Sequence, residues 1–463
     1  MSTILLLFLS TTIAHGFFGP NVRIDRESLP TSICLDAAIT VGPSTGSCQP
    51  LYVVFAYDST MSGPGYIVFQ KSPDAGKTWL SADVVVGRNG EYPDIATDRD
   101  GNIYVVYDGY QSGVHCTRST DGGSTWSDPA RVNDTGAGFS WARIAADSAG
   151  NLLCAWGDCR TGWERIWSSV STDRGTTWSQ SVRVDDDTVW DNCCQADVFV
   201  QPGTNDYLVA AEAPRPDGHP GCFLYRSTDM GRTFQPGVRL DTLSYASNPH
   251  VVADAQHVIC DCTWDSTEAR TWYTGPDTWG VPHAIGYSLQ DSRLAISADG
   301  RVHTALNGSG PGVYLVYYAS SSDHGFSWSA PVLVTDDTTA EKYDADIGAD
   351  SAGHAYVVWR DQRDGRNEIW FSTNCPAGIA EEPTRLPISA QPSATVVRNF
   401  LLLPSAASPK PQAASLLDIS GRQVVALKPG ANDVSRLSPG VYFVKEAQAQ
   451  AQAQALRKVV ITK

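Results

Sequence analysis

Hydrophobic and polar residues alternate along short segments of this chain, and turn residues separate the segments. The stretch 92–134, "YPDIATDRDGNIYVVYDGYQSGVHCTRSTDGGSTWSDPARVND", shows the pattern clearly. It predicts four strands, "DIATD", "IYVVYD", "VHCTRS" and "PARVND", because β-branched and aromatic residues fill them and Asp, Gly and Asn lie between them. The phrase "STDGGSTWS" occupies the turn between the third and the fourth strand.

The four-stranded unit recurs along residues 17–374. Its first strand returns at intervals of about 43 to 58 residues, and four-stranded repeats of this length are typical of β-propeller blades. We therefore expect an all-β fold with a seven-bladed propeller of four-stranded blades. The first-strand segments are "LDAAI" at 35, "PDIATD" at 93, "ARIAAD" at 142, "ADVFV" at 196, "PHVVAD" at 249, "SRLAIS" at 292 and "ADIGAD" at 345.

The last unit ends at "EIWFSTN" without a fourth strand of its own. The segment "NVRID" at 21–25 matches the fourth strands "PARVND", "SVRVDD" and "GVRLD" of other units. We expect this N-terminal strand to complete the last blade, because closing the ring would remove two exposed sheet edges.

The nine-residue phrase occurs five times, starting at 72, 119, 171, 227 and 321. Its Asp can accept hydrogen bonds from nearby amides, its Gly suits a positive φ, and its Trp (Phe234 in the fourth copy) can fill space between neighbouring sheets. The pattern resembles the Asp-box, S-x-D-x-G-x-[ST]-W, of sialidases and related propellers. The resemblance implies a sialidase-like propeller with these turns on the face away from the active site. Because sialidases of that family have six blades, a six-bladed propeller is the alternative.

The two ends of the chain differ in composition from the repeats. Residues 1–16 contain an apolar run followed by small residues, which indicates a secretory signal peptide, with a buried strand as the alternative. Residues 375–392 form a Pro-rich linker. In 393–463, strands separated by "SGRQ" and "SPG" turns suggest a small C-terminal β-sandwich, with the "AQAQAQAQA" run at 447–455 as a hairpin loop.

Three short segments of 393–463, "DISGRQV", "LSPGVYFVK" and "RKVVITK", resemble the C-terminal sorting domain of the type IX (Por) secretion system. The resemblance implies export across both membranes by the type IX machinery, followed by attachment at the cell surface. The alternative is an adhesive accessory domain without a sorting role. We expect a secreted protein, extracellular or on the outer-membrane surface, and a monomer.

Composition narrows the partners. The net charge of -16 argues against a nucleic-acid partner, because phosphate binding needs clustered Lys and Arg. Nothing after the first residues is long and apolar enough for a transmembrane segment. Eleven Cys allow disulfides in an exported chain, but no Cys or His spacing marks a metal site. We expect no cofactor, with Ca²⁺ on carboxylate oxygens as the alternative, and leave any metal ligands unknown.

Polar residues recur at one end of the predicted blades. Most lie 14 or 15 residues before the polar residue that ends the second strand, as Asp94 does before Asp108 and Arg293 before Asn307. We expect such pairs to lie opposite each other in their hairpins. Together with Asp361 they predict a ligand-binding site at the mouth of the central channel, with a solvated loop face as the alternative. The seven first-strand positions are Asp36, Asp94, Arg143, Asp197, His250, Arg293 and Asp346.

The sialidase resemblance also suggests catalytic residues. That family clamps a substrate carboxylate with three Arg, and it uses a Tyr nucleophile assisted by Glu together with an Asp acid/base. None of the candidates lies in a family motif, and the nearest match to R-I-P, at 23–25, reads Arg-Ile-Asp. The candidates by position are Arg143, Arg293, Arg360, Asp94, Glu212 and Tyr343.

Three functions stay open. The leading one is a secreted or cell-surface propeller that binds a glycan or another extracellular polymer at the channel mouth. The alternatives are an active exo-sialidase-type glycoside hydrolase and a scaffold for protein–protein contacts. Three Arg converging beside a Tyr–Glu pair would favour the enzyme, whereas an Asp-rich mouth without that clamp would favour binding.

Overall fold

The computed structural model consists of β-strands joined by turns, and no described residue is helical. It describes residues 17–376, apart from 27–32, 44–48, 59–64, 111, 135–138, 163, 186–194, 215–219, 241–245, 265–267, 276–277, 280–282, 288 and 311. Beyond 376 it describes 395–397, 400–403, 414–417, 422–428, 430–434, 436–438, 440–446 and 456–461.

Two compact units divide the chain, Met1–Ala380 and Glu381–Lys463. The predicted signal peptide at 1–16, the linker beyond residue 376 and the loop at 447–455 lie outside the described residues. Nowhere in the described part of the chain is there a helix with the length and apolar character needed to cross a membrane.

Seven antiparallel sheets make up the described part of the first unit, and we number them one to seven by their first strands. Those first strands are β2 (Ile33–Val41), β6 (Gly90–Thr97), β10 (Phe139–Ala146), β14 (Ala196–Val200), β18 (Ala246–Ala253), β23 (Leu289–Ile296) and β27 (Lys342–Ala349). The second strands are β3 (Leu51–Asp58), β7 (Ile103–Gly109), β11 (Leu152–Asp158), β15 (Tyr207–Pro214), β19 (Val258–Trp264), β24 (Val302–Ser309) and β28 (Ala355–Asp361).

The third strands are β4 (Tyr66–Ser72), β8 (Gly113–Ser119), β12 (Arg165–Ser171), β16 (Pro220–Ser227), β20 (Glu268–Gly275), β25 (Tyr314–Ser321) and β29 (Glu368–Thr373). The outermost strands are β5 (Val84–Arg88), β9 (Ala130–Arg131), β13 (Val182–Arg183), β17 (Val238–Arg239), β21 (Thr278–Trp279), β26 (Val332–Leu333) and β1 (Val22–Arg23). In sheet five, β22 (His283–Tyr287) also pairs with β20.

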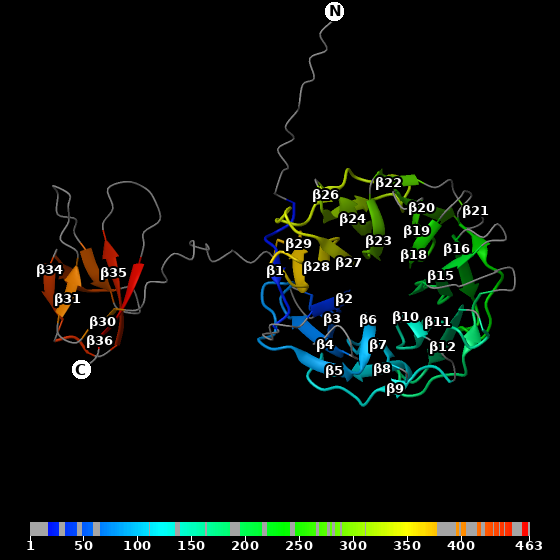
Figure 1. Cartoon of the computed structure of the whole chain (residues 1–463), viewed down its shortest axis with the longest axis horizontal. Coiled ribbons are helices and arrows are strands. Elements are labelled where there is room, and N and C mark those ends of the chain that lie inside the picture. Colours follow the sequence, from blue (N-terminus) through cyan, green and yellow to red (C-terminus); the bar gives the residue numbers. More distant parts are fainter. Residues whose placement is uncertain are drawn as a thin grey trace, which may run out of the picture. The chain divides into compact units, whose positions relative to one another are not determined.

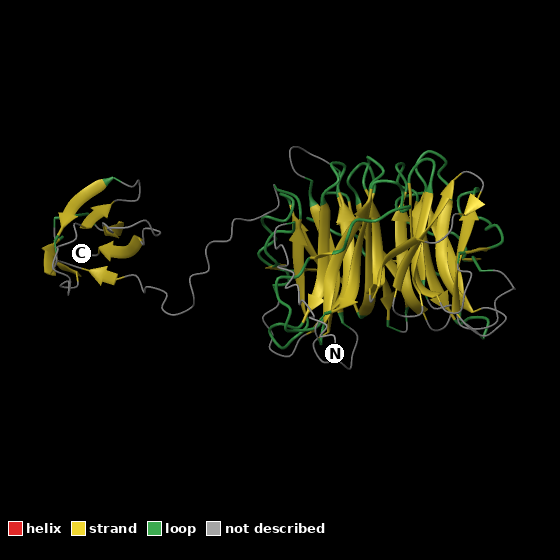
Figure 2. Cartoon of the chain, turned by 90° about the horizontal axis from the view of Figure 1, so that it is seen from above, coloured by secondary structure: helices red, strands yellow, loops and turns green. Residues whose placement is uncertain are grey.

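The seven sheets stand around a ring with their first strands toward its centre (Figure 1). Each first strand contacts the first strands of both neighbouring sheets, and β27 returns to contact β2. Seen from the side, the strands run between two opposite faces that carry the turns (Figure 2). This closed arrangement of antiparallel sheets is a β-propeller.

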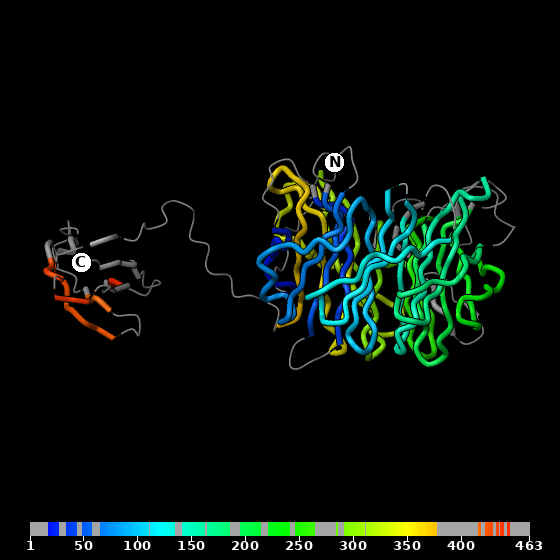
Figure 3. Tube along the Cα trace, turned by 90° about the horizontal axis from the view of Figure 1, so that it is seen from below, coloured from blue at the N-terminus to red at the C-terminus, as the bar shows by residue number. Residues whose placement is uncertain are grey.

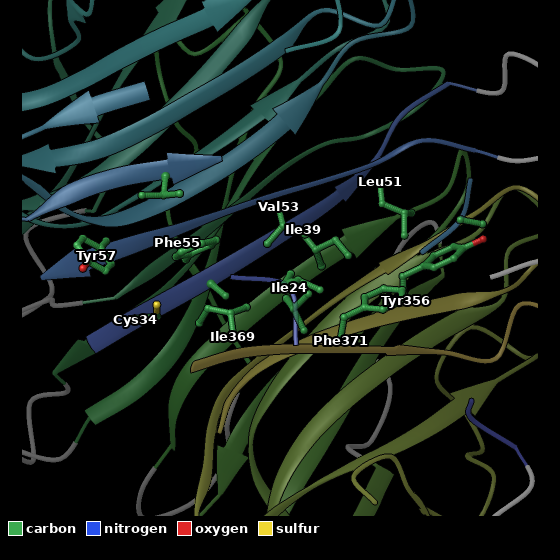
Figure 4. Close-up of a cluster of buried hydrophobic side chains, with 14 of the residues drawn as sticks. Ile24, Cys34, Ile39, Leu51, Val53, Phe55, Tyr57, Tyr356, Ile369 and Phe371 are labelled. Carbon is green, nitrogen blue, oxygen red and sulfur yellow. The ribbon is translucent and has the colours of Figure 1, made fainter. Parts of the chain in front are cut away.

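The N-terminal strand β1 belongs to the last sheet. Val22 pairs with Phe371 and Arg23 with Trp370, so the first described strand extends sheet seven on the outside of β29. Ile24 follows in the core between sheets seven and one, with no exposed surface, and the Asp25 carboxylate accepts the backbone N–H of Ile369 at 2.8 Å (Figure 4). The N-terminal tube accordingly lies beside the last sheet of the first unit (Figure 3).

The repeated phrase forms the turn that leaves each third strand where it occurs. In the second copy, the Asp121 carboxylate accepts the backbone N–H of Thr125 at 2.9 Å, and Ser119 Oγ accepts the N–H of Gly123 at 2.8 Å. The Trp126 ring packs edge-on against Phe69 of sheet one, with the ring centroids 5.0 Å apart. The phrase therefore joins neighbouring sheets, which is an architectural role.

A β-bulge recurs at the same place in six of the first hairpins and changes their predicted residue pairing. The first strands of sheets one, two, three, five, six and seven each shift register once against their second strands. Because of this bulge, Asp94 lies opposite Val106 rather than Asp108, and Arg293 lies opposite Ala305 rather than Asn307. The predicted cross-strand pairs are thus wrong, although both members stay at the same end of the hairpin.

The second unit contains a five-stranded sheet and a two-stranded sheet in its described part. Leu416, Leu427, Val434 and Val444 form its small buried cluster. The five-stranded sheet has the order β30 (Thr395–Val397), β36 (Leu456–Ile461), β35 (Gly440–Glu446), β32 (Ala414–Leu417) and β33 (Gln423–Leu427). The two-stranded sheet consists of β31 (Phe400–Leu403) and β34 (Gly430–Asp433). The predicted sandwich stays a prediction.

Replacing Ile24 with Ala is expected to lower the free energy of unfolding by about 2 to 5 kcal/mol, since it leaves a cavity where the last and first sheets meet. Urea titration followed by Trp fluorescence measures this in the propeller alone, because all 14 Trp precede residue 375. The matched control is Val238→Ala in the outermost strand of sheet four, where the side chain is 43% exposed and a change within about 0.5 kcal/mol is expected. Equal losses in both variants would contradict a closing role for β1.

Candidate site at the channel mouth

Six first strands place a non-glycine residue in the left-handed backbone region at their bulge. Backbone strain of this kind costs roughly 1 to 2 kcal/mol per residue and is found where a side chain must be redirected. We call these positions the outer row: Asp36 (φ 50°), Tyr92 (φ 50°), Trp141 (φ 47°), Asn248 (φ 52°), Asp291 (φ 47°) and Asp344 (φ 51°).

A second set of side chains, which we call the inner row, lies two residues after each bulge and at Asp197 in sheet four, where the register does not shift. Its members pair with equivalent residues of the second strands, such as Val106, Ala155 and Val358. The inner row consists of Ala38, Asp94, Arg143, Asp197, His250, Arg293 and Asp346.

This alignment corrects the predicted place of Asp36. The sequence pattern made Asp36 the equivalent of Asp94, but the structure makes Ala38 that equivalent, since Ala38 pairs with Val54 as Asp94 pairs with Val106. Asp36 instead occupies the bulge, where Tyr92 stands in sheet two. Asp36 nevertheless lines the cavity at the mouth, because the bulge redirects its side chain.

Both rows line one cavity of about 370 Å³, so all seven predicted first-strand residues come together. Six carboxylates and two guanidinium groups face this space, which makes the mouth acidic overall. The aromatic rings of Tyr92 and Trp141 stand edge-on on one side, with centroids 5.7 Å apart. The charged lining consists of Asp36, Asp94, Arg143, Asp197, Asp291, Arg293, Asp344 and Asp346, and His250, Gln195, Asn248 and Asn307 add polar groups.

Three inner-row carboxylates also hold neighbouring sheets together. Asp94 accepts the backbone N–H of Ile144 at 2.8 Å, Asp197 that of Val251 at 2.9 Å, and Asp346 that of Ile39 at 2.8 Å. In each case the acceptor belongs to one sheet and the donor to the first strand of the next. These bonds give the three Asp residues a structural role, because each joins one sheet to the next.

A polar chain crosses sheets four, five and six. Arg293 donates to Nδ1 of His250 at 3.0 Å, and that nitrogen lies 3.5 Å from the Asp197 carboxylate. Burial and the adjacent guanidinium lower the pKa of His250 to about 4, so its imidazole is neutral at physiological pH. The pKa of Asp197 is lowered despite its burial, because the charge of Arg293 and the backbone N–H of Val251 favour its charged form.

Asp94 and Arg143 form the opposite side of the inner row. Burial raises the pKa of Asp94 to about 6, and the charge of Arg143 offsets part of that rise. Burial, with a further contribution from Asp344, likewise raises the pKa of Asp36 to about 6. The Arg143 side chain forms no hydrogen bond and no ion pair with any described residue. Its guanidinium can therefore donate to a bound molecule.

The ends of the second strands serve as braces. Asp108 accepts the backbone N–H of Ala142 at 3.3 Å, Glu212 that of Asn248 at 3.4 Å, and Asn307 that of Ala345 at 3.4 Å. Each bond reaches the next sheet at its bulge. The recurrence of polar residues at these positions thus has a structural cause.

Two predicted residues, Asp361 and Glu212, lie outside the cavity lining because other parts of the protein engage their carboxylates. Asp361 is fully buried, where it accepts the indole N–H of Trp359 at 3.0 Å and pairs with Arg363 at 2.7 Å. Glu212 is engaged by the brace to Asn248. Neither carboxylate faces the space at the mouth.

The residues suggested by the sialidase resemblance separate into two groups. Arg143, Arg293 and Asp94 line the cavity, whereas Arg360, Tyr343 and Glu212 do not. Arg360 pairs with Asp344 at 3.1 Å and stacks on the Tyr343 ring, 4.9 Å from its centroid. Among the described residues, the cavity lining therefore contains two Arg, not three, and no Tyr–Glu pair.

Sequence reasoning missed the outer row apart from Asp36, and it missed Asp261. Tyr92, Trp141 and Asn248 each stand two residues before an inner-row residue, a spacing that only the bulge turns into a shared mouth. Asp261 lies opposite His250 in sheet five, where the other sheets have Val or Ala. Its only sequence signal is an Asp inside the apolar run "VICDCTW".

No group of mouth carboxylates, as far as the described residues go, brings its oxygens close enough together to share one cation. Elsewhere in the described chain, two groups of side chains could share a cation. They are Asp254 with His257 and His324, and Asp350 with His354 and Cys375. Calcium at the mouth stays a prediction.

No protein-family model and no curated protein matches the chain. Solved structures do resemble it. A protein of unknown function from Dyadobacter fermentans is 16% identical, with a TM-score of 0.50 over 76% of this chain and 97% of that one. A PL25 ulvan lyase is 12% identical, with a TM-score of 0.50 over 77% of this chain and 94% of that one. Trypanosoma rangeli sialidase is 14% identical, with a TM-score of 0.46 over 64% of this chain and 56% of that one.

These likenesses define a class and go no further. Identities of 12 to 16% show a shared fold, and the sialidase match is too distant to bear on activity. The chain is a β-propeller, and its function must be argued from the residues at its own channel mouth.

Stability is expected to rise as the pH falls from about 8 to about 6.5. Burial raises the pKa of Asp261 to about 8, so in this range the folded state holds a proton that the unfolded chain has lost. One such carboxyl changes the free energy of unfolding by up to about 1.4 kcal/mol per pH unit. Urea titrations across this range measure the slope.

Asp261→Asn should make that slope shallower and stabilise the protein at pH 8, since the amide never ionises. Asp108 and Glu368, whose pKa values burial raises to about 7, leave a residual slope of the same sign. His250 and His303 oppose it toward pH 6.5, because their lowered pKa values of about 4 keep them neutral in the folded state while the unfolded chain takes up protons. The control is Asp299→Asn, because the pKa of Asp299 is lowered and it does not titrate in this range. Identical slopes in all three proteins would refute the assignment.

Proposed function

We propose that this chain is an exported seven-bladed propeller that binds a glycan or another extracellular polymer at the channel mouth. The observation that carries the proposal is the cavity, in which an aromatic pair, Tyr92 and Trp141, stands beside the charged side chains of both rows. Sites for small polar molecules combine apolar faces with a few convergent polar groups. A sugar ring offers both kinds of surface.

The chemistry of the lining suits hydroxyl-rich ligands. Carboxylates accept hydrogen bonds from hydroxyl groups, and charge-assisted bonds of this kind are the strong ones. Arg143 can donate to a ring oxygen, a hydroxyl or an acidic substituent. The aromatic rings of Tyr92 and Trp141 can contact the C–H face of a pyranose. The left-handed backbone at both aromatic residues fixes their direction before the ligand arrives.

Binding is favoured over sialidase catalysis by what the cavity assembles. The clamp that the sialidase resemblance implies needs three Arg, and Arg360 is instead held by Asp344 and Tyr343 outside the lining. The Glu and Tyr candidates, Glu212 and Tyr343, are engaged in other contacts. The part of the mouth that the structure describes is acidic, with two Arg and no Tyr–Glu pair, and we expect it to select a ligand by hydrogen bonding.

Export and attachment complete the proposal. They rest on residues 1–16 as a signal peptide and on 393–463 as a small β-sandwich that the type IX machinery recognises. In that arrangement the Pro-rich linker at 375–392 tethers a monomeric propeller to the cell surface. The PL25 ulvan lyase, which shares the fold, has been solved with the saccharide -[GlcA(1-4)Rha3S]- bound. The architecture is therefore compatible with a bound polymer.

Binding to soluble polysaccharides tests the proposal. We expect the full chain to bind a member of a panel of neutral, carboxylated and sulfated polysaccharides, measured by calorimetry. Trp141→Ala and Arg143→Ala should each weaken that binding at least about tenfold, because each removes an anchor of the cavity. The control is Arg99→Ala, an exposed Arg on the β6–β7 turn at the other end of sheet two. Unchanged affinity in both mouth variants, or no binding by the parent chain, would refute the site.

Hydrolysis of a fluorogenic sialoside distinguishes the enzyme alternative. We expect no turnover above that of the buffer, since the described lining of the cavity contains two of the three expected Arg. Turnover by the parent chain that disappears in Arg293→Ala would overturn the binding proposal in favour of a sialidase.

A further inference from the structure

A second cluster of side chains lies away from the mouth. Asp254 and His257 belong to the turn between β18 and β19, and His324 is the fourth residue of the repeated phrase after β25. Nδ1 of His257 and Nδ1 of His324 each lie 3.0 Å from the same oxygen, Oδ2 of Asp254. The two imidazole rings face each other, with centroids 4.0 Å apart and an interplanar angle of 37°.

The backbone around these groups is fixed by local hydrogen bonds. Oδ1 of Asp254 accepts the N–H groups of Gln256 and His257, both at 2.7 Å, which turns Oδ2 toward the rings. His324 has a φ of 60°, because the phrase winds its turn through the left-handed region. Ser321 Oγ accepts the N–H of Gly325 at 2.8 Å and holds that turn in place. The cluster is thus preorganised from two sheets.

Comparison with other turns separates this cluster from ordinary architecture. Asp98 binds the side chain of Asn102 and Asp147 that of Asn151, both at 2.7 Å and four residues on. Asp350 binds His354 at 2.9 Å in the same way, so the group that contains Asp350 repeats a standard turn contact. The Asp254 turn is one residue shorter, and the other copies have Ala75, Gly122, Arg174 and Met230 in place of His324. Arg174 likewise pairs with a carboxylate of the preceding sheet, that of Asp100 at 2.5 Å, so what distinguishes the Asp254 turn is that two imidazoles share one carboxylate oxygen.

Two imidazoles and one carboxylate are a ligand set typical of zinc and its neighbours in the transition series. Around a tetrahedral zinc ion, with bonds of about 2.0 to 2.1 Å, ligand atoms lie about 3.3 Å apart. The two nitrogen–oxygen distances of 3.0 Å need to lengthen by only a few tenths of an ångström to reach that spacing, and all three ligand atoms lie within 4.8 Å of one another. The side chains of His257, Asp254 and His324 are 17%, 24% and 31% exposed, so a water can complete the coordination.

We propose that Asp254, His257 and His324 bind one zinc ion, or a similar divalent transition metal, at the seam between sheets five and six. The ion would join the two sheets on the face opposite the mouth. The phrase of sheet six spans the same seam, since its Trp328 packs against the buried cluster that contains Val252 and Ile259 of sheet five. The metal would therefore add a second link to the one that the phrase supplies.

The test measures zinc binding by the tag-free full chain. Isothermal titration with ZnCl₂ should show one saturable site, and zinc should raise the melting temperature, because a ligand that binds the folded state stabilises it. His324→Gly should weaken zinc binding at least about tenfold and abolish the stabilisation. This variant is expected to fold, because Gly122 occupies the same position of the second copy at a φ of 69°.

Two further variants complete the design. His257→Asn should lose zinc binding in the same way, and Asn keeps a polar group at the turn. His354→Asn is the matched control: it removes an imidazole from the Asp350 turn and copies the Asn of sheets two and three, so zinc binding should be unchanged. Absence of a saturable site in the parent chain would overturn the proposal. So would equal affinity in the parent chain and in His324→Gly.

Discussion

The structure depends on how neighbouring sheets meet around the channel. Their first strands converge there without forming a common ladder, so backbone amides at the seams need acceptors from side chains. Asp94, Asp197 and Asp346 supply them to the next sheet, and Asp108, Glu212 and Asn307 do so at the bulges. Leaving a buried amide without a partner costs about 1 to 3 kcal/mol, which explains why so many acidic residues are retained in one small space.

Because of this requirement, the inner row and the outer row have different roles. The inner row is largely occupied with the seams and with the chain from Asp197 through His250 to Arg293. The outer row stands at strained bulges with its side chains redirected into the cavity, and it contains the aromatic pair. A charged mouth is therefore a by-product of assembly, and in the proposed function the outer row together with Arg143 recognises the polymer.

Strands and repeats could be predicted from sequence because alternation and turn chemistry are local properties. The all-β class, the four-stranded units and the gathering of Asp94, Arg143, Asp197 and Arg293 follow from them. The bulge could not be predicted, since it arises where sheets meet. Without it, the sequence analysis assigned the wrong position to Asp36 and the wrong cross-strand partners to Asp94 and Arg293. Nor could sequence separate Arg143 from Arg360, because the capture of Arg360 by Asp344 and Tyr343 is a tertiary contact.

The closure of sheet seven by β1 affects when the propeller can finish folding during its synthesis. The bond from Ile369 to Asp25 joins residues 344 positions apart, so the seam at the start of the ring stays open until almost the whole propeller has been synthesised. Contacts of such long sequence separation form slowly, since the loop must close before they contribute. Under the proposed export, an incomplete propeller would remain loose enough to be threaded through a translocation pore and would become rigid only on the far side.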